Sequence, residues 1–157
     1  MPIQKVISSA VSHLGYQEGA NNDNKFAAIA GHANHQPWCA TFINAIFKEG
    51  GEHAAIPNSA SCEFIEAWGV KGNRTRTKVT AKRGDLILMD FTKSGKSQHI
   101  GIAIHDFDPK TNTIQTIEGN TGEKSQANGD GVYKKKRQLE FIRAVIRPNW
   151  SDANEAK

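Results

Sequence analysis

One cysteine in this sequence stands where a nucleophile would be expected. Cys39 follows Pro37 and Trp38 and opens an apolar run that continues to Phe47. Proline suits the entry to a helix, so we expect Cys39 in the first helical turn. The N–H groups of that turn are unpaired and carry a partial positive charge, which favours a thiolate over a thiol. Such a thiolate can attack a carbonyl carbon if the chain also supplies a base and a group that orients the base.

Candidates for these two partners lie in the second half of the chain. His99 begins an alternating segment, Glu118 ends the next predicted strand, and Asn120 follows two residues later. An imidazole can take and return the proton of a thiol, and a carboxylate or amide can fix its tautomer. Such partners meet in space, so their separation along the chain is no objection. Each residue alone is more often structural than catalytic, and only the set indicates a catalytic centre.

The elements that must position these residues are helices first and strands afterwards. Helical spacing of apolar residues predicts four helical segments, Ile3–Leu14, Lys25–Ala30, a helix from Cys39 to the Gly50-Gly51 pair, and Ser61–Trp68. Apolar or alternating runs predict the strands Leu86–Met89, His99–His105, Thr113–Glu118 and Leu139–Ile146, with a short one starting at Val132. This order is typical of an α+β domain with an antiparallel meander.

The strand that begins at His99 has an unusual face. Its isoleucines share one side, whereas His99, Gly101, Ala103 and His105 share the other. Small residues let another element come close. We therefore expect the cysteine helix to pack on the side of Gly101 and Ala103.

The second cysteine and two nearby histidines admit other interpretations. A bridge between Cys39 and Cys62 would consume the candidate nucleophile, so we expect Cys62 to be a small buried hydrophobe. His32, His35 and Cys39 invite a zinc site, but no second Cys or His pair follows at the required spacing. We therefore expect no zinc.

The composition fits one soluble domain. The chain has 157 residues, 38% hydrophobic and 23% charged, with a net charge of +4 and a pI near 9.1. This charge would suit nucleic acid, a membrane or a bacterial wall, and cannot choose among them. The basic stretches Lys71–Arg83 and Lys134–Arg137 are predicted to be solvated, since no aromatic residues interleave the first one. No apolar run is long enough to cross a bilayer, and the N-terminus does not read as a secretory signal.

Four motifs together resemble a CHAP domain, the cysteine, histidine-dependent amidohydrolase/peptidase family. They are Pro37–Phe42, Gly84–Ile87, His99–Ile102 and Ile117–Asn120, and the resemblance covers about Glu18 to Ile146. It implies a papain-like fold of the NlpC/P60 type, with N-terminal helices packed on an antiparallel β-sheet. The catalytic domain would be residues 1–147, and residues 148–157 would be a C-terminal tail or linker.

The resemblance also implies a role for each site residue. Cys39 would be the nucleophile, and His99 the general base and then the acid toward the leaving amine. Glu118 would orient His99, and Asn120 would complete the site. Substrate-binding candidates are Gln36 and Trp38. Some relatives bind calcium before the cysteine, but here Asp23 is the only carboxylate of that loop. We expect no cofactor, with calcium near Asp23 as the alternative.

The function that the resemblance implies is hydrolysis of an amide bond in bacterial peptidoglycan, in the manner of a phage endolysin. The enzyme would be an N-acetylmuramoyl-L-alanine amidase or a peptide endopeptidase. We expect a monomer without nucleic-acid partner or membrane insertion, made in the host cytoplasm and reaching the wall through holin pores or another route. The alternatives are an interbacterial effector or wall-remodelling amidase with the same chemistry, and a catalytically silent wall-binding module.

Overall fold

A computed structural model of the chain describes residues 1–123 and 128–157, and its helices precede its strands. The helices are α1 (Pro2–Ser12), α2 (Phe26–Ala30), α3 (Cys39–Glu49) and α4 (Cys62–Lys71). The strands are β1 (Thr75–Arg76), β2 (Leu86–Met89), β3 (His99–Ala103), β4 (Thr113–Thr121), β5 (Gly131–Gln138) and β6 (Ile142–Ile146). Short 3-10 turns are η1 (Ala20–Asn22), η2 (His53–Ala55), η3 (Lys78–Thr80) and η4 (Leu139–Phe141).

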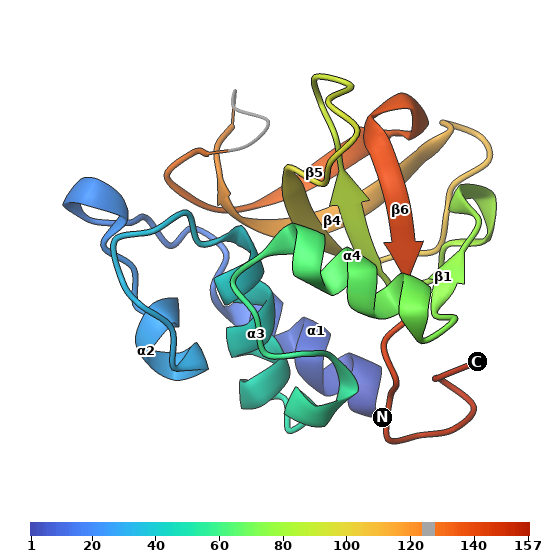
Figure 1. Cartoon of the computed structure of the whole chain (residues 1–157), viewed down its shortest axis with the longest axis horizontal. Coiled ribbons are helices and arrows are strands. Elements are labelled where there is room, and N and C mark those ends of the chain that lie inside the picture. Colours follow the sequence, from blue (N-terminus) through green and yellow to red (C-terminus); the bar gives the residue numbers. More distant parts are fainter. Residues whose placement is uncertain (124–127) are drawn as a thin grey trace.

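The described strands form one antiparallel sheet in the order β1-β6-β2-β3-β4-β5. Helices α1, α2 and α3 gather on one side of the molecule, and the sheet occupies the other (Figure 1). The predicted α+β architecture is therefore confirmed. None of the helices in residues 1–123 and 128–157 is long and apolar enough to span a bilayer.

Helix α3 is the central helix. Every residue from Cys39 to Phe47 is buried, as its apolar sequence requires, and the helix ends at Gly50. At Gly50 a Cβ atom would lie 2.7 Å from Cγ2 of Val6, so the C-terminal end of α3 meets α1 closely. A helix fixed on several sides in this way gives its first residue a defined place.

Helix α3 packs against the face of β3 that carries the isoleucines. Our expectation that α3 packs against the small-residue face is wrong. Ile100 and Ile102 belong to the same apolar core as Phe42 and Ile43 of α3. Ala103 belongs to a second core on the opposite face. The space beside Gly101 is instead filled by the side chain of Glu118 from β4.

The glycine that admits the helix is Gly119 on β4. A Cβ atom there would lie 2.6 Å from Cβ of Phe42 and 2.8 Å from Cζ3 of Trp38. The backbone of β4 therefore comes close to the first turns of α3 at this point. Glu118, the neighbour of Gly119, points to the other face, so the same short segment contacts both the helix and the histidine.

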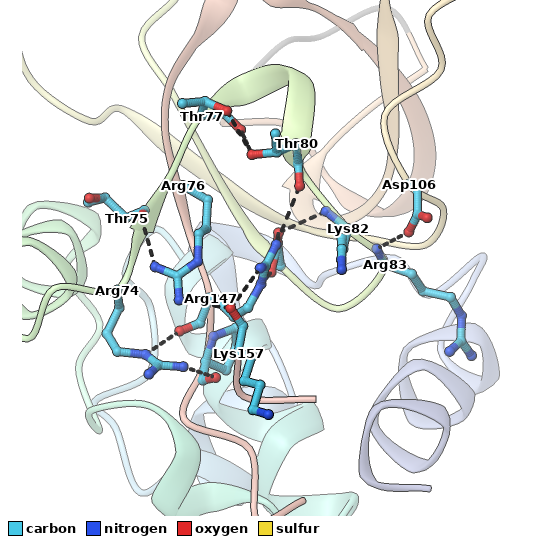
Figure 2. Close-up of polar contacts among 12 residues, drawn as sticks. Arg74, Thr75, Arg76, Thr77, Thr80, Lys82, Arg83, Asp106, Arg147 and Lys157 are labelled. Atoms are coloured by element: carbon cyan, nitrogen blue, oxygen red, sulfur yellow. Dashed lines mark hydrogen bonds and ion pairs between the residues drawn. The ribbon is translucent and has the colours of Figure 1, made fainter. Parts of the chain in front are cut away.

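Residues 148–157 fold back onto the domain. Trp150 is buried and stacks on Phe47 of α3, with ring centroids 5.1 Å apart. Arg74 donates to the carbonyl oxygens of Arg147 and Pro148 at 2.8 Å and to that of Ala156. Figure 2 shows Arg74 and Arg147 turned toward this segment. The basic side chain of Arg74, predicted to be solvated, thus binds backbone carbonyls of the C-terminal segment.

Candidate active site

Cys39 is the first residue of α3, as predicted. Its thiol is 7% exposed and lies 3.6 Å from Sγ of Cys62, the first residue of α4. A hydrogen bond from Cys62 lowers the pKa of Cys39 well below its usual value, against the effect of burial, and contacts with His99 and the N–H of Ala40 lower it further. The same contact and burial raise the pKa of Cys62. These opposite shifts favour ionisation of Cys39 over ionisation of Cys62.

His99, the first residue of β3, is fully buried, and one of its two ring nitrogens makes a hydrogen bond. Its Nε2 lies 2.9 Å from Oε1 of Glu118. Burial lowers the pKa of His99, but the interactions with Cys39 and Glu118 outweigh this effect and raise the pKa to about 9. Nδ1 makes no hydrogen bond within the described residues and is the nitrogen left for the thiol proton. The lowered pKa of Cys39 and the raised pKa of His99 together favour a thiolate beside an imidazolium.

Glu118 is fully buried and ionised. Burial raises the pKa of its carboxyl group, but hydrogen bonds from Arg137 and His99 lower it to about 2. Its Oε2 also accepts a hydrogen bond of 2.5 Å from the hydroxyl of Thr116, on the same strand. A buried carboxylate held in this way stabilises the protonated form of His99.

Arg137 is the residue of this site that our sequence analysis missed. We predicted that Lys134–Arg137 is solvated, but Arg137 is only 5% exposed and binds both oxygens of Glu118. Strand β5 alternates so that Tyr133, Lys135 and Arg137 share a face. That alternation, read together with a buried carboxylate that needs a counter-charge, is the signal that would have found it.

The other predicted site residues lie in different surroundings. Asn120 is buried, has a positive φ of 55°, and its Oδ1 has no partner among the described residues. Gln36 is exposed in the loop before α3. Trp38 is fully buried, stacks on Phe26 and donates from Nε1 to Oε1 of Glu18 at 2.9 Å. Trp38 therefore has no surface for a substrate and belongs to the core behind Cys39.

The residues behind the two metal hypotheses have other partners or stand apart in the structure. Within residues 1–123 and 128–157, no three His, Cys, Asp or Glu side chains gather as a metal site. His32 instead pairs with Thr41 and Asn58, and His35 with the carbonyl oxygen of Asn21. Calcium near Asp23 stays an untested prediction.

The sequence matches no protein-family model and no curated protein, but the fold has clear counterparts among solved structures. The peptidoglycan hydrolase RipB from Mycobacterium tuberculosis aligns with a TM-score of 0.59 and 19% identity, over 93% of this chain and 64% of RipB. The P60 domain of an antigen from M. avium subspecies paratuberculosis aligns with a TM-score of 0.58 and 18% identity, over 93% of both chains.

A third counterpart is a mutated form of RipA, the Resuscitation Promoting Factor Interacting protein. It aligns with a TM-score of 0.57 and 16% identity, over 94% of this chain and 62% of RipA. This chain thus spans less than two thirds of the RipA and RipB chains. Identities this low establish the fold alone. The structural alignments confirm the predicted papain-like fold of the NlpC/P60 type.

Proposed function

We propose that the chain is a cysteine amidohydrolase that cleaves an amide bond of bacterial peptidoglycan, as CHAP domains of endolysins do. The observation that carries this proposal is the buried chain of contacts from Cys39 through His99 to Glu118, with the thiol at a helix N-terminus. This arrangement has the parts that thiol-dependent acyl transfer needs. It lies on a fold shared with the peptidoglycan hydrolase RipB.

In the first half of the reaction the Cys39 thiolate attacks the amide carbon. The negative charge that develops on the amide oxygen would be stabilised by the unpaired N–H of Cys39 at the start of α3. The imidazolium of His99 then donates its Nδ1 proton to the leaving nitrogen. The amine departs, and the acyl group remains on Cys39 as a thioester.

In the second half, water replaces the amine. Neutral His99 takes a proton from water at Nδ1, and the resulting hydroxide attacks the thioester carbon. Collapse of the intermediate releases a carboxylic acid and restores the Cys39 thiolate and the His99 imidazolium. Glu118 keeps its charge throughout and holds Nε2, and Asn120 is proposed to complete this side of the site.

The direct test is hydrolysis of purified cell walls by the Cys39→Ala and Cys39→Ser variants. We expect both to lose wall hydrolysis while circular dichroism and the unfolding midpoint stay near those of the unaltered protein. The Gln36→Ala variant is the matched comparison, because it alters an exposed residue three positions before Cys39, in the loop that precedes α3, and tests substrate contact alone. Retained hydrolysis by Cys39→Ala would refute the mechanism.

The bond cleaved is settled by mass spectrometry of fragments released from defined peptidoglycan. New L-alanine N-termini alone would identify an N-acetylmuramoyl-L-alanine amidase. New termini within the stem peptide or cross-link would identify an endopeptidase. Intact peptidoglycan after incubation with protein whose Cys39 reacts readily with iodoacetamide would exclude the wall as substrate.

A further inference from the structure

We propose that Arg137 is a positioning residue, which holds the Glu118 carboxylate in the orientation in which Oε1 contacts His99. This inference rests on the proposed function, because it assigns a role to the base of that reaction. Arg137 Nε donates to Oε2 of Glu118 at 2.8 Å, and its Nη2 donates to Oε1 at 2.5 Å. Two parallel bonds of this kind fix the plane of a carboxylate as well as its charge.

Among the described residues, Glu118 has four polar contacts, two at each of its carboxylate oxygens. Oε1 contacts His99 Nε2 and Arg137 Nη2, and Oε2 accepts from Thr116 and from Arg137 Nε. Rotation of the carboxylate about its terminal bond would break bonds at both oxygens. Arg137 is the one group that bonds to both, so the orientation of Glu118 toward His99 depends on it more than on Thr116.

Arg137 is itself held from the other side. It reaches Glu118 from the neighbouring strand β5, where it pairs in register with Ile114, and its guanidinium lies over the ring of Phe91, 4.9 Å from the centroid. The Phe91 ring in turn lies 6.1 Å from that of His99. An aromatic face suits a guanidinium and leaves it few alternative positions. The Arg137 guanidinium is thus already held in place for its two hydrogen bonds to Glu118 in the absence of substrate.

The charges around Glu118 predict what loss of Arg137 does. Glu118 is faced by His99 from β3, by Arg137 and more remotely Lys135 from β5, and beyond His99 by the thiolate of Cys39 from α3. Without Arg137, burial would raise the pKa of Glu118, so the carboxyl group would take up a proton at mildly acidic pH. A neutral Glu118 no longer stabilises the imidazolium, and the thiolate–imidazolium pair would be lost there.

The experiment measures two rates against pH for the unaltered protein, Arg137→Met and Arg137→Lys. One is wall hydrolysis, and the other is alkylation of Cys39 by iodoacetamide, identified by peptide mapping. We expect Arg137→Met to hydrolyse walls roughly 10- to 100-fold more slowly at neutral pH. We also expect its acid limb, the part of each profile where the rate falls toward low pH, to move up by about one pH unit or more. Arg137→Lys keeps the positive charge but cannot make both hydrogen bonds to Glu118. We therefore expect its acid limb to lie close to that of the unaltered protein, while its rate at neutral pH stays reduced.

The matched control is Arg147→Met. Arg147 makes the same kind of two-bond contact with Asp85, at 2.8 and 2.9 Å. This pair is buried much like Arg137 and Glu118, but neither of its residues forms a hydrogen bond or ion pair with His99 within the described part of the chain. Its loss should lower stability without moving the acid limb. If Arg137→Met lowers the rates by one factor at every pH, as Arg147→Met would, Arg137 is only structural and the proposal fails. In the Glu118→Gln background, Arg137→Met should add little further loss.

The alkylation profile separates this proposal from the proposed function. It needs no wall substrate, so a shifted acid limb in a protein that leaves peptidoglycan intact would support the role of Arg137 and refute the substrate. If instead Arg137→Met leaves the acid limb unshifted while the unaltered protein hydrolyses walls, the substrate is supported and the role of Arg137 is refuted.

A second observation, the contact between the two thiols, carries an independent inference. We infer that Cys39 and Cys62 form a site of reversible oxidation by peroxides. Their sulfur atoms lie 3.6 Å apart, each on the first residue of a helix, and both side chains keep a small exposed fraction. Cys39 has the thiolate character that peroxides select, and Cys62 lies beside it as a resolving thiol.

The chemistry balances in two steps. The Cys39 thiolate attacks a peroxide oxygen, the O–O bond breaks, and hydroxide leaves and takes a proton as water, so that Cys39 becomes a sulfenic acid. The Cys62 sulfur, on losing its proton, attacks the sulfenic sulfur, and hydroxide leaves and is protonated to a second water. Two thiols have lost two electrons, and one hydrogen peroxide has become two waters. The bridge removes the nucleophile until a dithiol reduces it.

Hydrogen peroxide and then dithiothreitol test this inference on the unaltered protein and on Cys62→Ala, with each activity scaled to that variant before treatment. We expect the unaltered protein to lose wall hydrolysis together with both free thiols and two hydrogens of mass, and to regain most activity on reduction. Cys62→Ala should instead gain oxygen atoms on Cys39 and recover little. Oxygen addition to Cys39 in the unaltered protein, with Cys62 still free, would overturn it. The mass and thiol count are independent of wall hydrolysis.

Discussion

The side chain of Glu118 occupies the space that Gly101 leaves open on the neighbouring strand. A Cβ atom at Gly101 would lie 2.6 Å from Cγ of Glu118 and 3.2 Å from Cβ of Thr116. Glu118 leans across this gap toward His99, two residues along β3. The small residue in the histidine strand is therefore a requirement of the buried carboxylate.

Substitution of Gly101 by alanine tests this relationship. The added methyl must displace Glu118, whose carboxylate is tied to both His99 and Arg137, so the base would lose its alignment. We expect wall hydrolysis to fall by roughly 10- to 100-fold in kcat, with a smaller change in KM. Steady-state kinetics on soluble wall fragments measure both. A kcat equal to that of the unaltered protein would show that catalysis does not depend on this position of the Glu118 side chain.

Substitution of Gly119 by alanine has a different expected effect. Its methyl would collide with Phe42 and Trp38, where α3 and β4 approach each other, so the cost falls on the packing of the core. We expect a loss of about 1–3 kcal/mol in the free energy of unfolding, measured by urea titration. Gly101→Ala serves as the comparison, since its contact is with one buried side chain. Equal stability of Gly119→Ala and the unaltered protein would contradict the close helix–strand contact.

The raised pKa of His99 predicts the alkaline limit of activity. In the proposed mechanism the His99 imidazolium protonates the leaving amine, and this form is present below about pH 9 and lost above it. We expect kcat to fall as pH rises through about 9. In Glu118→Gln the hydrogen bond and charge that raise the pKa of His99 are weakened, so the falling limb should move to lower pH. The profile of kcat against pH measures both limbs, and an unmoved limb would exclude Glu118 as the stabilising partner.

The lowered pKa of Glu118 predicts acid destabilisation. Its folded-state pKa is about 2, below the usual value of 4.5, so its ionised form contributes stability that is present above pH 4.5 and is lost as pH falls toward 2. The contribution is on the order of 3 kcal/mol. Urea unfolding at a series of pH values should show a weaker acid dependence for Glu118→Gln than for the unaltered protein. Identical slopes between pH 4.5 and 2 would refute it.

The sequence predicted those parts of the fold that depend on local patterns. The apolar run after Cys39 specified a buried helix, and Leu86–Met89 is a strand with the predicted bounds. His99 and Glu118 were predicted on neighbouring strands, where the structure brings their side chains together. Their catalytic roles stay proposals.

What the sequence did not predict depends on which face of the sheet each neighbour covers. Gly101 and Gly119 are both small, and only the three-dimensional packing decides which one admits a helix and which one a carboxylate. Arg137 was hidden in a basic run whose lysines are more exposed. A strand turns alternate residues to opposite faces, so a basic run in a strand can still place one cation in the core.

The stacking of Trp150 on Phe47 has a consequence for where the chain can be shortened. Phe47 lies in the last turn of α3 and Cys39 in its first, so the C-terminal segment supports the far end of the helix that begins at Cys39. Glu52 strengthens this attachment by accepting hydrogen bonds from the backbone and hydroxyl of Ser151. A fragment ending at residue 147 would uncover an aromatic ring of the central helix. We therefore expect the smallest unit that folds on its own to extend beyond β6 and to include this segment.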